Sequence, residues 1–144
     1  MNRGVRILAV LALAGALGAS GLAAQEAGSG EQISVQDGVY TEAQAERGEE
    51  TYDQVCGYCH SESQFSGSSF LRAWSGAAVG QIYGLVSTTM PYDLPASLTK
   101  QQYIDVIAYI LSLNEFPAGS TELAPDRAAL GQIRIEAPSG EGGS

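Results

Sequence analysis

The chain has 144 residues, enough for one domain, and a formal net charge of −9 at pH 7. Sixteen acidic residues against seven basic ones argue against nucleic acid and anionic membrane surfaces as partners. The excess of acid favours either a basic partner or simple solubility.

Residues 1–24 have the pattern of an export signal. Arg3 and Arg6 precede an apolar run from Ile7 to Leu17, and small residues end the segment. The alternative is a retained membrane anchor, which the short, Ala- and Gly-rich run favours less. Cleavage would leave five basic against sixteen acidic residues, a net charge of −11, and no membrane span. Periplasmic or other exported localisation is therefore expected.

Residues 25–39 are rich in Gly, Ser, Gln and Glu, and they predict a flexible leader. A helix is then expected from Thr41 to Cys56, with Thr41 and Gln44 forming a capping box. Its apolar or small residues repeat at helical spacing at positions 45, 48, 52 and 55. Gly48 in mid-helix indicates close passage of another helix, or is merely tolerated.

Cys56-Gly57-Tyr58-Cys59-His60 holds both cysteines and the only histidine of the chain. C-x-x-C-H is the pattern that attaches a c-type haem, with two thiols for the vinyl groups and an imidazole for the iron. A zinc site normally needs four ligands, and only three are present here. A thioredoxin-like dithiol normally follows a strand, but a helical pattern precedes this motif. A plain disulfide is the remaining alternative.

The segment after the motif, residues 61–69, predicts a loop. Phe70, Leu71 and Trp74 follow, and they are expected to cover the porphyrin edge on the His60 side. The Trp74 indole N–H needs a partner if it is buried, and either a haem propionate or ordinary core packing would account for this residue.

A second helix is expected from Ser75 to Val86, with Ile82 and Tyr83 on its apolar face. Met90 follows in a loop with two prolines, Pro91 and Pro95. A lone methionine is often a core filler. In a Pro-flanked loop after C-x-x-C-H it is expected to be the second axial ligand, since His and Met commonly hold haem iron together.

The strongest helical pattern runs from Thr99 to Leu113, again with a capping box formed by Thr99 and Gln102. Beyond it, residues 118–136 are expected to pack back on the domain, with Pro125 starting a short helical turn. Residues 137–144 predict a disordered tail.

These residues together resemble the class I c-type cytochromes. The match rests on Cys56, Cys59 and His60, on Met90-Pro91, and on the two end helices, which in that family cross near a small residue and an aromatic. Gly48 with Tyr52 and Ala108 with Tyr109 fit that crossing. The resemblance implies an all-α fold, a cytochrome c domain at residues 40–117, and three to five helices around one covalently attached haem. A narrower likeness is to cytochromes associated with quinoprotein alcohol dehydrogenases.

The resemblance implies a one-electron carrier and no enzyme activity of its own. Redox proteins are the expected partners: a donor dehydrogenase or respiratory complex, and an acceptor oxidase or reductase, docking at the haem edge beside Tyr58, Pro91 and Tyr92. The alternatives are a subunit held tightly in a dehydrogenase complex, or a ligand-binding or peroxidase-like protein with an open iron site. His60 and Met90 are the predicted iron ligands. The predicted haem-binding residues are Cys56, Cys59, His60, Phe70, Leu71, Trp74, Ile82, Tyr83, Met90 and Pro91.

The chain departs from its relatives after the motif. Ser61 stands where many have glycine, and no proline lies between His60 and Pro91. A hydrogen-bond acceptor for the His60 ring is expected, but the sequence does not identify it.

Overall fold

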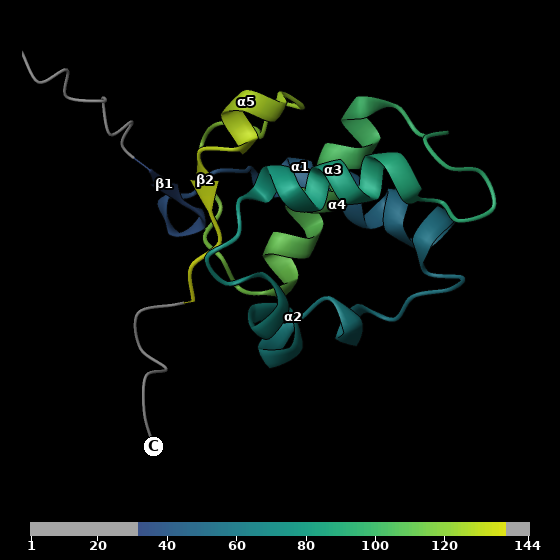
Figure 1. The fold of residues 1–144 in the computed structure, drawn as a ribbon, viewed down its shortest axis with the longest axis horizontal. Coiled ribbons are helices and arrows are strands. Elements are labelled where there is room, and N and C mark those ends of the chain that lie inside the picture. The colour runs from purple at the N-terminus through teal and green to yellow at the C-terminus, as the bar shows by residue number, and fades with distance from the viewer. Residues whose placement is uncertain (1–31, 138–144) are drawn as a thin grey trace, which may run out of the picture.

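The computed structural model describes residues 32–137 (Figure 1). The predicted export signal, residues 25–31 of the predicted leader and residues 138–144 of the predicted tail lie outside the described residues. The all-α fold class is confirmed, because helices dominate the described chain. The helices are α1 (Glu42–Thr51), α2 (Gly67–Trp74), α3 (Val79–Thr89), α4 (Lys100–Leu113) and α5 (Arg127–Leu130), with short helical turns at Val35–Asp37, Tyr52–Cys56 and Glu62–Gln64.

The two ends of the described chain form a small parallel sheet. Strand β1 (Ile33–Ser34) pairs with β2 (Ile133–Arg134), with Ile33 opposite Ile133. Val35 follows and is fully buried. Residues 33–39 are therefore part of the folded domain, which differs from the flexible leader expected there. Composition alone did not reveal a pairing between segments 100 residues apart.

Helices α1 and α4 cross in close contact. A Cβ atom added to Gly48 would lie 2.0 Å from the carbonyl oxygen of Asp105 and 2.9 Å from the Cβ of Tyr109. The interpretation of Gly48 as a point of close helix passage is confirmed. The salt bridge from Arg47 to Asp105, with 3.1 Å between Nε and Oδ2, lies next to this crossing.

The predicted capping box at the start of α1 is only half formed. Thr41 Oγ1 accepts the N–H of Gln44 at 3.2 Å, as expected. The Gln44 side chain does not return to Thr41. Instead its amide donates to the Leu123 carbonyl at 3.0 Å and accepts from the Leu123 N–H at 2.8 Å. This buried pair of bonds fastens the C-terminal segment to α1.

Several helix boundaries differ from the sequence-based expectation; α1 ends at Thr51 before a separate helical turn, and α3 continues to Thr89. Residues 67–69 begin α2 rather than ending a loop, because the Gly67 N–H is held by Asn114 Oδ1 at 2.9 Å. Helix α3 begins at Val79, four residues later than predicted, because Gly76 adopts φ +81° and its N–H bonds to the Ile135 carbonyl. Helix α4 begins one residue after Thr99, which caps it in a complete capping box.

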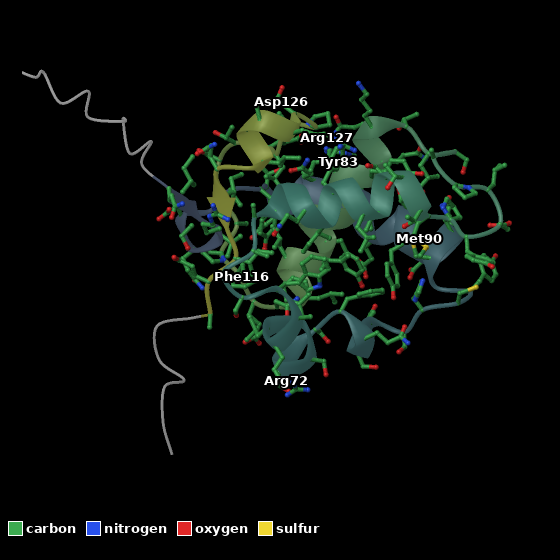
Figure 2. The ribbon with its side chains drawn as sticks, in the orientation of Figure 1. Arg72, Tyr83, Met90, Phe116, Asp126 and Arg127 are labelled. Atoms are coloured by element: carbon green, nitrogen blue, oxygen red, sulfur yellow. The ribbon has the colours of Figure 1, made fainter. Side chains whose placement is uncertain are left out.

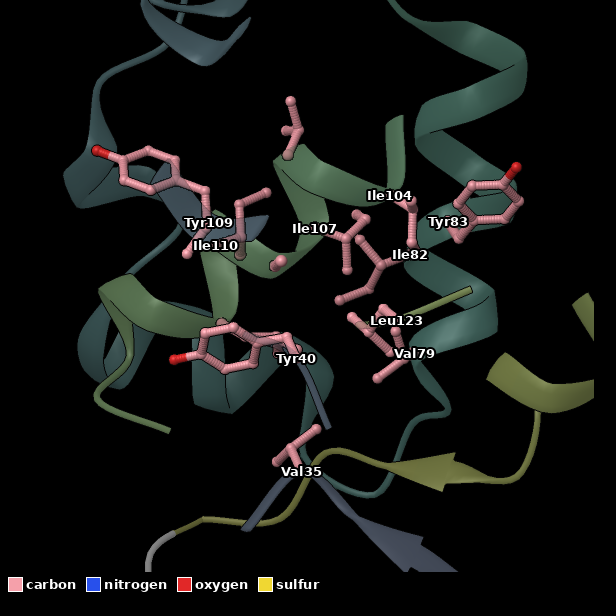
Figure 3. Packing of buried hydrophobic residues seen from close by; sticks show 14 of the residues in the cluster. Val35, Tyr40, Val79, Ile82, Tyr83, Ile104, Ile107, Tyr109, Ile110 and Leu123 are labelled. Atoms are coloured by element: carbon pink, nitrogen blue, oxygen red, sulfur yellow. The ribbon is translucent and has the colours of Figure 1, made fainter. Parts of the chain in front are cut away.

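The core lies between α1, α3 and α4 and extends to the C-terminal segment (Figure 3). Leu123, Leu130, Ile133 and Ile135 are all buried in it. Helix α5 is capped by Asp126, so Pro125 precedes the helix instead of starting it. None of the helices within residues 32–137 is long and apolar enough to span a membrane.

Candidate functional site

A cavity of about 560 Å³ opens beside the C-x-x-C-H segment, within the size range of ligand sites. Its lining is mostly apolar and aromatic. Cys56, Cys59, His60 and Met90 all contribute to it, although Met90 lies 30 residues beyond His60. The full lining is Tyr52, Val55, Cys56, Tyr58, Cys59, His60, Phe65, Phe70, Trp74, Ile82, Leu85, Val86, Thr89, Met90, Pro91, Tyr92, Asp93, Leu98, Tyr103, Val106 and Ile110.

Most of the predicted cofactor-binding residues line this cavity, but Leu71 and Tyr83 do not. On α2, Phe70 and Trp74 are one turn apart and both line the cavity, whereas Leu71 packs against the hydrophobic core without bordering the cavity. On α3, Ile82 points toward α4, whereas Tyr83 points away from it (Figure 3). Gly80, one turn before Tyr83, approaches Leu130 and Gly131, so this face of α3 packs on α5.

Helix α4 supplies cavity residues that were not predicted. Tyr103, Val106 and Ile110 are spaced at i, i+3 and i+7, and they line the cavity. Their periodicity predicted an apolar stripe but could not say whether the stripe meets another helix or a cofactor. Phe65, expected in a loop, also lines the cavity. Its ring lies 5.2 Å from the His60 ring at an interplanar angle of 61°.

Cys56 ends the helical turn that follows α1, and Cys59 lies three residues beyond it. Both thiols are free, Cys56 half-buried and Cys59 exposed. The Cys56 carbonyl accepts the N–H of Cys59 at 3.1 Å and that of His60 at 3.0 Å, so one turn of backbone holds all three side chains. Burial raises the pKa of the Cys56 thiol above its usual value.

His60 is half-buried and hydrogen-bonded at both its ring and its backbone. The Tyr52 hydroxyl donates to the His60 carbonyl at 3.1 Å. The ring Nδ1 lies 3.2 Å from Gln64 Oε1. This contact identifies the acceptor that the sequence left open.

The turn after His60 is anchored to α4. The Tyr109 hydroxyl donates to Glu62 Oε1 at 2.5 Å. Asn114 Nδ2 donates to the Phe65 carbonyl at 2.8 Å. Burial and, after it, the Glu62 hydrogen bond raise the pKa of Tyr109.

Met90 directly follows the last residue of α3 (Figure 2), and hydrogen bonds fix its backbone on both sides. Its N–H donates to the Val86 carbonyl at 3.0 Å. Its carbonyl accepts the Tyr103 hydroxyl at 2.6 Å and the Ala96 N–H at 3.1 Å. These bonds hold the residue where its side chain lines the cavity.

This set of side chains fits a haem. Two reduced thiols at C-x-x-C spacing, an imidazole and a thioether all border one large apolar cavity. Among residues 32–137, no group of three or more His, Cys, Asp or Glu side chains is arranged to hold a metal ion. Cys56, Cys59 and His60 therefore do not converge as a zinc site requires.

Comparison with protein families agrees with this geometry. Residues 43–110 match the family described as cytochrome C oxidase, cbb3-type, subunit III. The match supports a c-type cytochrome domain at these residues. The domain contains the C-x-x-C-H motif and Met90, and it supports binding of haem c, a role in electron transfer and redox partners. The chain has no significant match among curated proteins or solved structures.

Proposed function

We propose that the chain is an exported one-electron carrier. Its haem is held by Cys56 and Cys59, with His60 and Met90 as the two iron ligands. The observation that carries this proposal is the single apolar cavity bordered by all four side chains. The pattern of residues 1–24 supports export. A bound haem supplies a one-electron ferric–ferrous couple.

The cysteines would attach the haem without net oxidation or reduction. Each thiol adds across one vinyl double bond, sulfur to one carbon and hydrogen to the other. The hydrogen bond from the Cys59 N–H to the Cys56 carbonyl keeps the two cysteines within one turn of backbone. His60 would hold one axial position, with its ring fixed by Gln64 and Phe65.

Met90 and the apolar lining would set the redox properties. A thioether opposite an imidazole raises the reduction potential. Ile82, Val106 and Ile110 exclude water from the cavity, which also disfavours the more highly charged ferric form. With His60 and Met90 both bound to the iron, a substrate would find no free ligand position there, and the sequence has no second histidine to act as an acid or base.

Electron exchange would take place at the cavity mouth. Tyr58 and Tyr92 border the cavity and are 84% and 89% exposed, and Pro91 lies between Met90 and Tyr92. Such an apolar rim suits brief contact with a donor dehydrogenase or respiratory complex and with an acceptor oxidase or reductase. Redox encounters of this kind typically bury less than about 1,200 Å².

Co-expression with a haem-attachment system tests covalent binding. The protein should be red and keep its haem through acid–acetone extraction. Cys56→Ala and Cys59→Ala should each leave one thioether bond or none, and the double variant should release all haem. Haem that extracts completely from the unaltered protein, or a colourless protein, would overturn the proposal and favour the dithiol alternative.

A tightly held subunit is the second candidate. The matched family is described as an oxidase subunit, and the sequence resemblance to quinoprotein-associated cytochromes points to a dehydrogenase complex. Size-exclusion chromatography of the native protein separates the two roles. A free carrier elutes at the size of the single chain, whereas a subunit elutes with its complex.

A further inference from the structure

The hydrogen bond between His60 and Gln64 fixes which ring nitrogen carries the proton. Gln64 Oε1 lies 3.2 Å from His60 Nδ1 and also accepts the backbone N–H of Ser61 at 3.2 Å. A backbone N–H can only donate, so the shared Gln64 atom must be the carbonyl oxygen and not the amide nitrogen. Nδ1 must therefore donate, and in the neutral imidazole this leaves Nε2 unprotonated and able to bind a metal.

The Gln64 side chain is held in place although it is exposed. Gln64 ends the helical turn Glu62–Gln64, and its own N–H donates to the Ser61 carbonyl at 3.0 Å. Tyr109 fixes the start of this turn through Glu62, and Asn114 fixes the residue after it through the Phe65 carbonyl. Helix α4 thus sets the position of the amide that meets the ring.

Within residues 32–137, Gln64 is the hydrogen-bond partner found for the His60 ring. The acceptor is a side chain and not a backbone carbonyl, so a single substitution can remove it or change its charge. An acceptor on the far nitrogen of a ligating histidine fixes the ring orientation and makes the ligating nitrogen more basic.

We propose that Gln64 is the positioning residue of the axial histidine and that it tunes the reduction potential through the Nδ1 hydrogen bond. This inference rests on the proposed function, since it requires haem iron on His60. Gln64 does not touch the iron. It acts only by orienting the imidazole and by increasing the electron donation from Nε2, which stabilises the ferric form.

Three variants of the full-length, haem-loaded protein test the proposal. Gln64→Leu removes the acceptor, and Gln64→Glu replaces it with a carboxylate that accepts more strongly. Gln54→Glu is the matched control. It adds the same charge two residues before Cys56, where the side chain bonds to Glu50 and not to His60.

The reduction potential should move in opposite directions in the two Gln64 variants. Loss of such a partner typically changes metal affinity by about tenfold or more. A tenfold loss of ferric relative to ferrous affinity in Gln64→Leu would raise the potential by about 59 mV for a one-electron couple. The reduction potential of Gln64→Glu should be lower than that of the unaltered protein and lower than that of Gln54→Glu.

Proton NMR of the reduced protein gives a readout independent of potential. The chain has one histidine, so a ¹⁵N-histidine label yields one Nδ1–H signal. This proton should exchange with water slowly in the unaltered protein, Gln64→Glu and Gln54→Glu, but rapidly in Gln64→Leu.

Two results would overturn the inference alone: an exchange rate unchanged by Gln64→Leu, or a Gln64→Glu potential equal to that of Gln54→Glu. If Gln64→Leu fails to load haem, the difference in reduction potential between Gln64→Glu and Gln54→Glu tests the inference instead. An unaltered protein without covalent haem would overturn both this inference and the proposed function, so the two failures are distinguishable.

Discussion

Tyr109 connects the helix crossing to the turn that follows His60. Its hydroxyl donates to Glu62, and its ring lies 5.4 Å from that of Tyr52, which donates to the His60 carbonyl. Burial raises the pKa of both tyrosines, and the neighbouring acidic groups raise them further. Both phenols therefore stay neutral in the folded protein at a pH that ionises them in the unfolded chain.

This pKa difference predicts a loss of stability at alkaline pH. Below about pH 10 the tyrosines are neutral in both states, so they add no pH dependence. Above it the unfolded chain releases protons that the folded chain retains, and the free energy of unfolding falls as pH rises. The free energy of unfolding of Tyr109→Phe, measured by denaturant titration, should therefore fall less steeply with pH across this range.

The same variant should already be less stable at neutral pH by about 1.5 kcal/mol, because it loses a hydrogen bond to a carboxylate. Tyr92→Phe is the control, since the Tyr92 side chain is 89% exposed and should not affect stability. Equal alkaline slopes for Tyr109→Phe and the unaltered protein would contradict this account.

Among the elements, the contact of α1 with α4 depends most on one residue. Any side chain at Gly48 would meet the Asp105 carbonyl and Tyr109, and both belong to a helix that also anchors the His60 turn. Widening the crossing would therefore also disturb the haem site.

Gly48→Ala should destabilise the protein by about 3 kcal/mol, toward the upper end of what overpacking a core costs. Gly84→Ala is the matched control within a helix, because a Cβ there meets nothing within 4 Å. It should stabilise the protein by about 1 kcal/mol through helix propensity. Urea unfolding measures both changes. Similar effects of the two substitutions would show that the crossing is not tightly packed.

A capping pattern in the sequence predicted the start of a helix correctly where the two residues of the pattern bond to each other. Thr99 and Gln102 form the box that the sequence indicates, and α4 begins within one residue of the prediction. Gln44 has the same spacing from Thr41, yet its side chain bonds Leu123 instead, 79 residues away. Such distant partners, like the pairing of Ile33 with Ile133, leave no local pattern to detect.

The candidate site also combines residues that a local pattern reveals with residues that only distant contacts bring into place. The residues proposed to attach the haem are close together in the sequence and were identified from their spacing alone. Gln64 was not, because its contact with His60 depends on the turn that Tyr109 and Asn114 hold from α4. Leu71 and Tyr83 are predicted at the haem because they are large and apolar or lie on an apolar helix face, but that pattern does not distinguish a residue facing the cavity from one packed elsewhere in the core.

At the scale of the whole molecule, the sheet and the loop after Met90 lie at opposite ends (Figure 1). The exposed Tyr92 belongs to that loop, so the cavity mouth is away from the paired chain ends. The chain has sixteen acidic residues against seven basic ones, and this excess would attract a basic redox partner from a distance.

Electron-transfer rates with a basic redox protein should therefore fall steeply as salt rises, since exposed charges are screened over about 10 Å at 0.1 M. Stopped-flow mixing at several salt concentrations measures this rate, and an uncharged small redox mediator is the control. A rate with the basic partner that stays flat or increases with salt would mean that the acidic surface does not steer docking.

The most direct test of the central claim is a spectroscopic redox titration of the haem-loaded protein beside Met90→Ala. The unaltered protein should show one reversible one-electron transition with low-spin iron in both states. Met90→Ala should have a lower potential and a changed ferric spectrum, because a thioether raises the potential. Identical potentials and spectra for the two proteins would show that Met90 does not bind the iron, and would contradict the proposed His60–Met90 electron carrier.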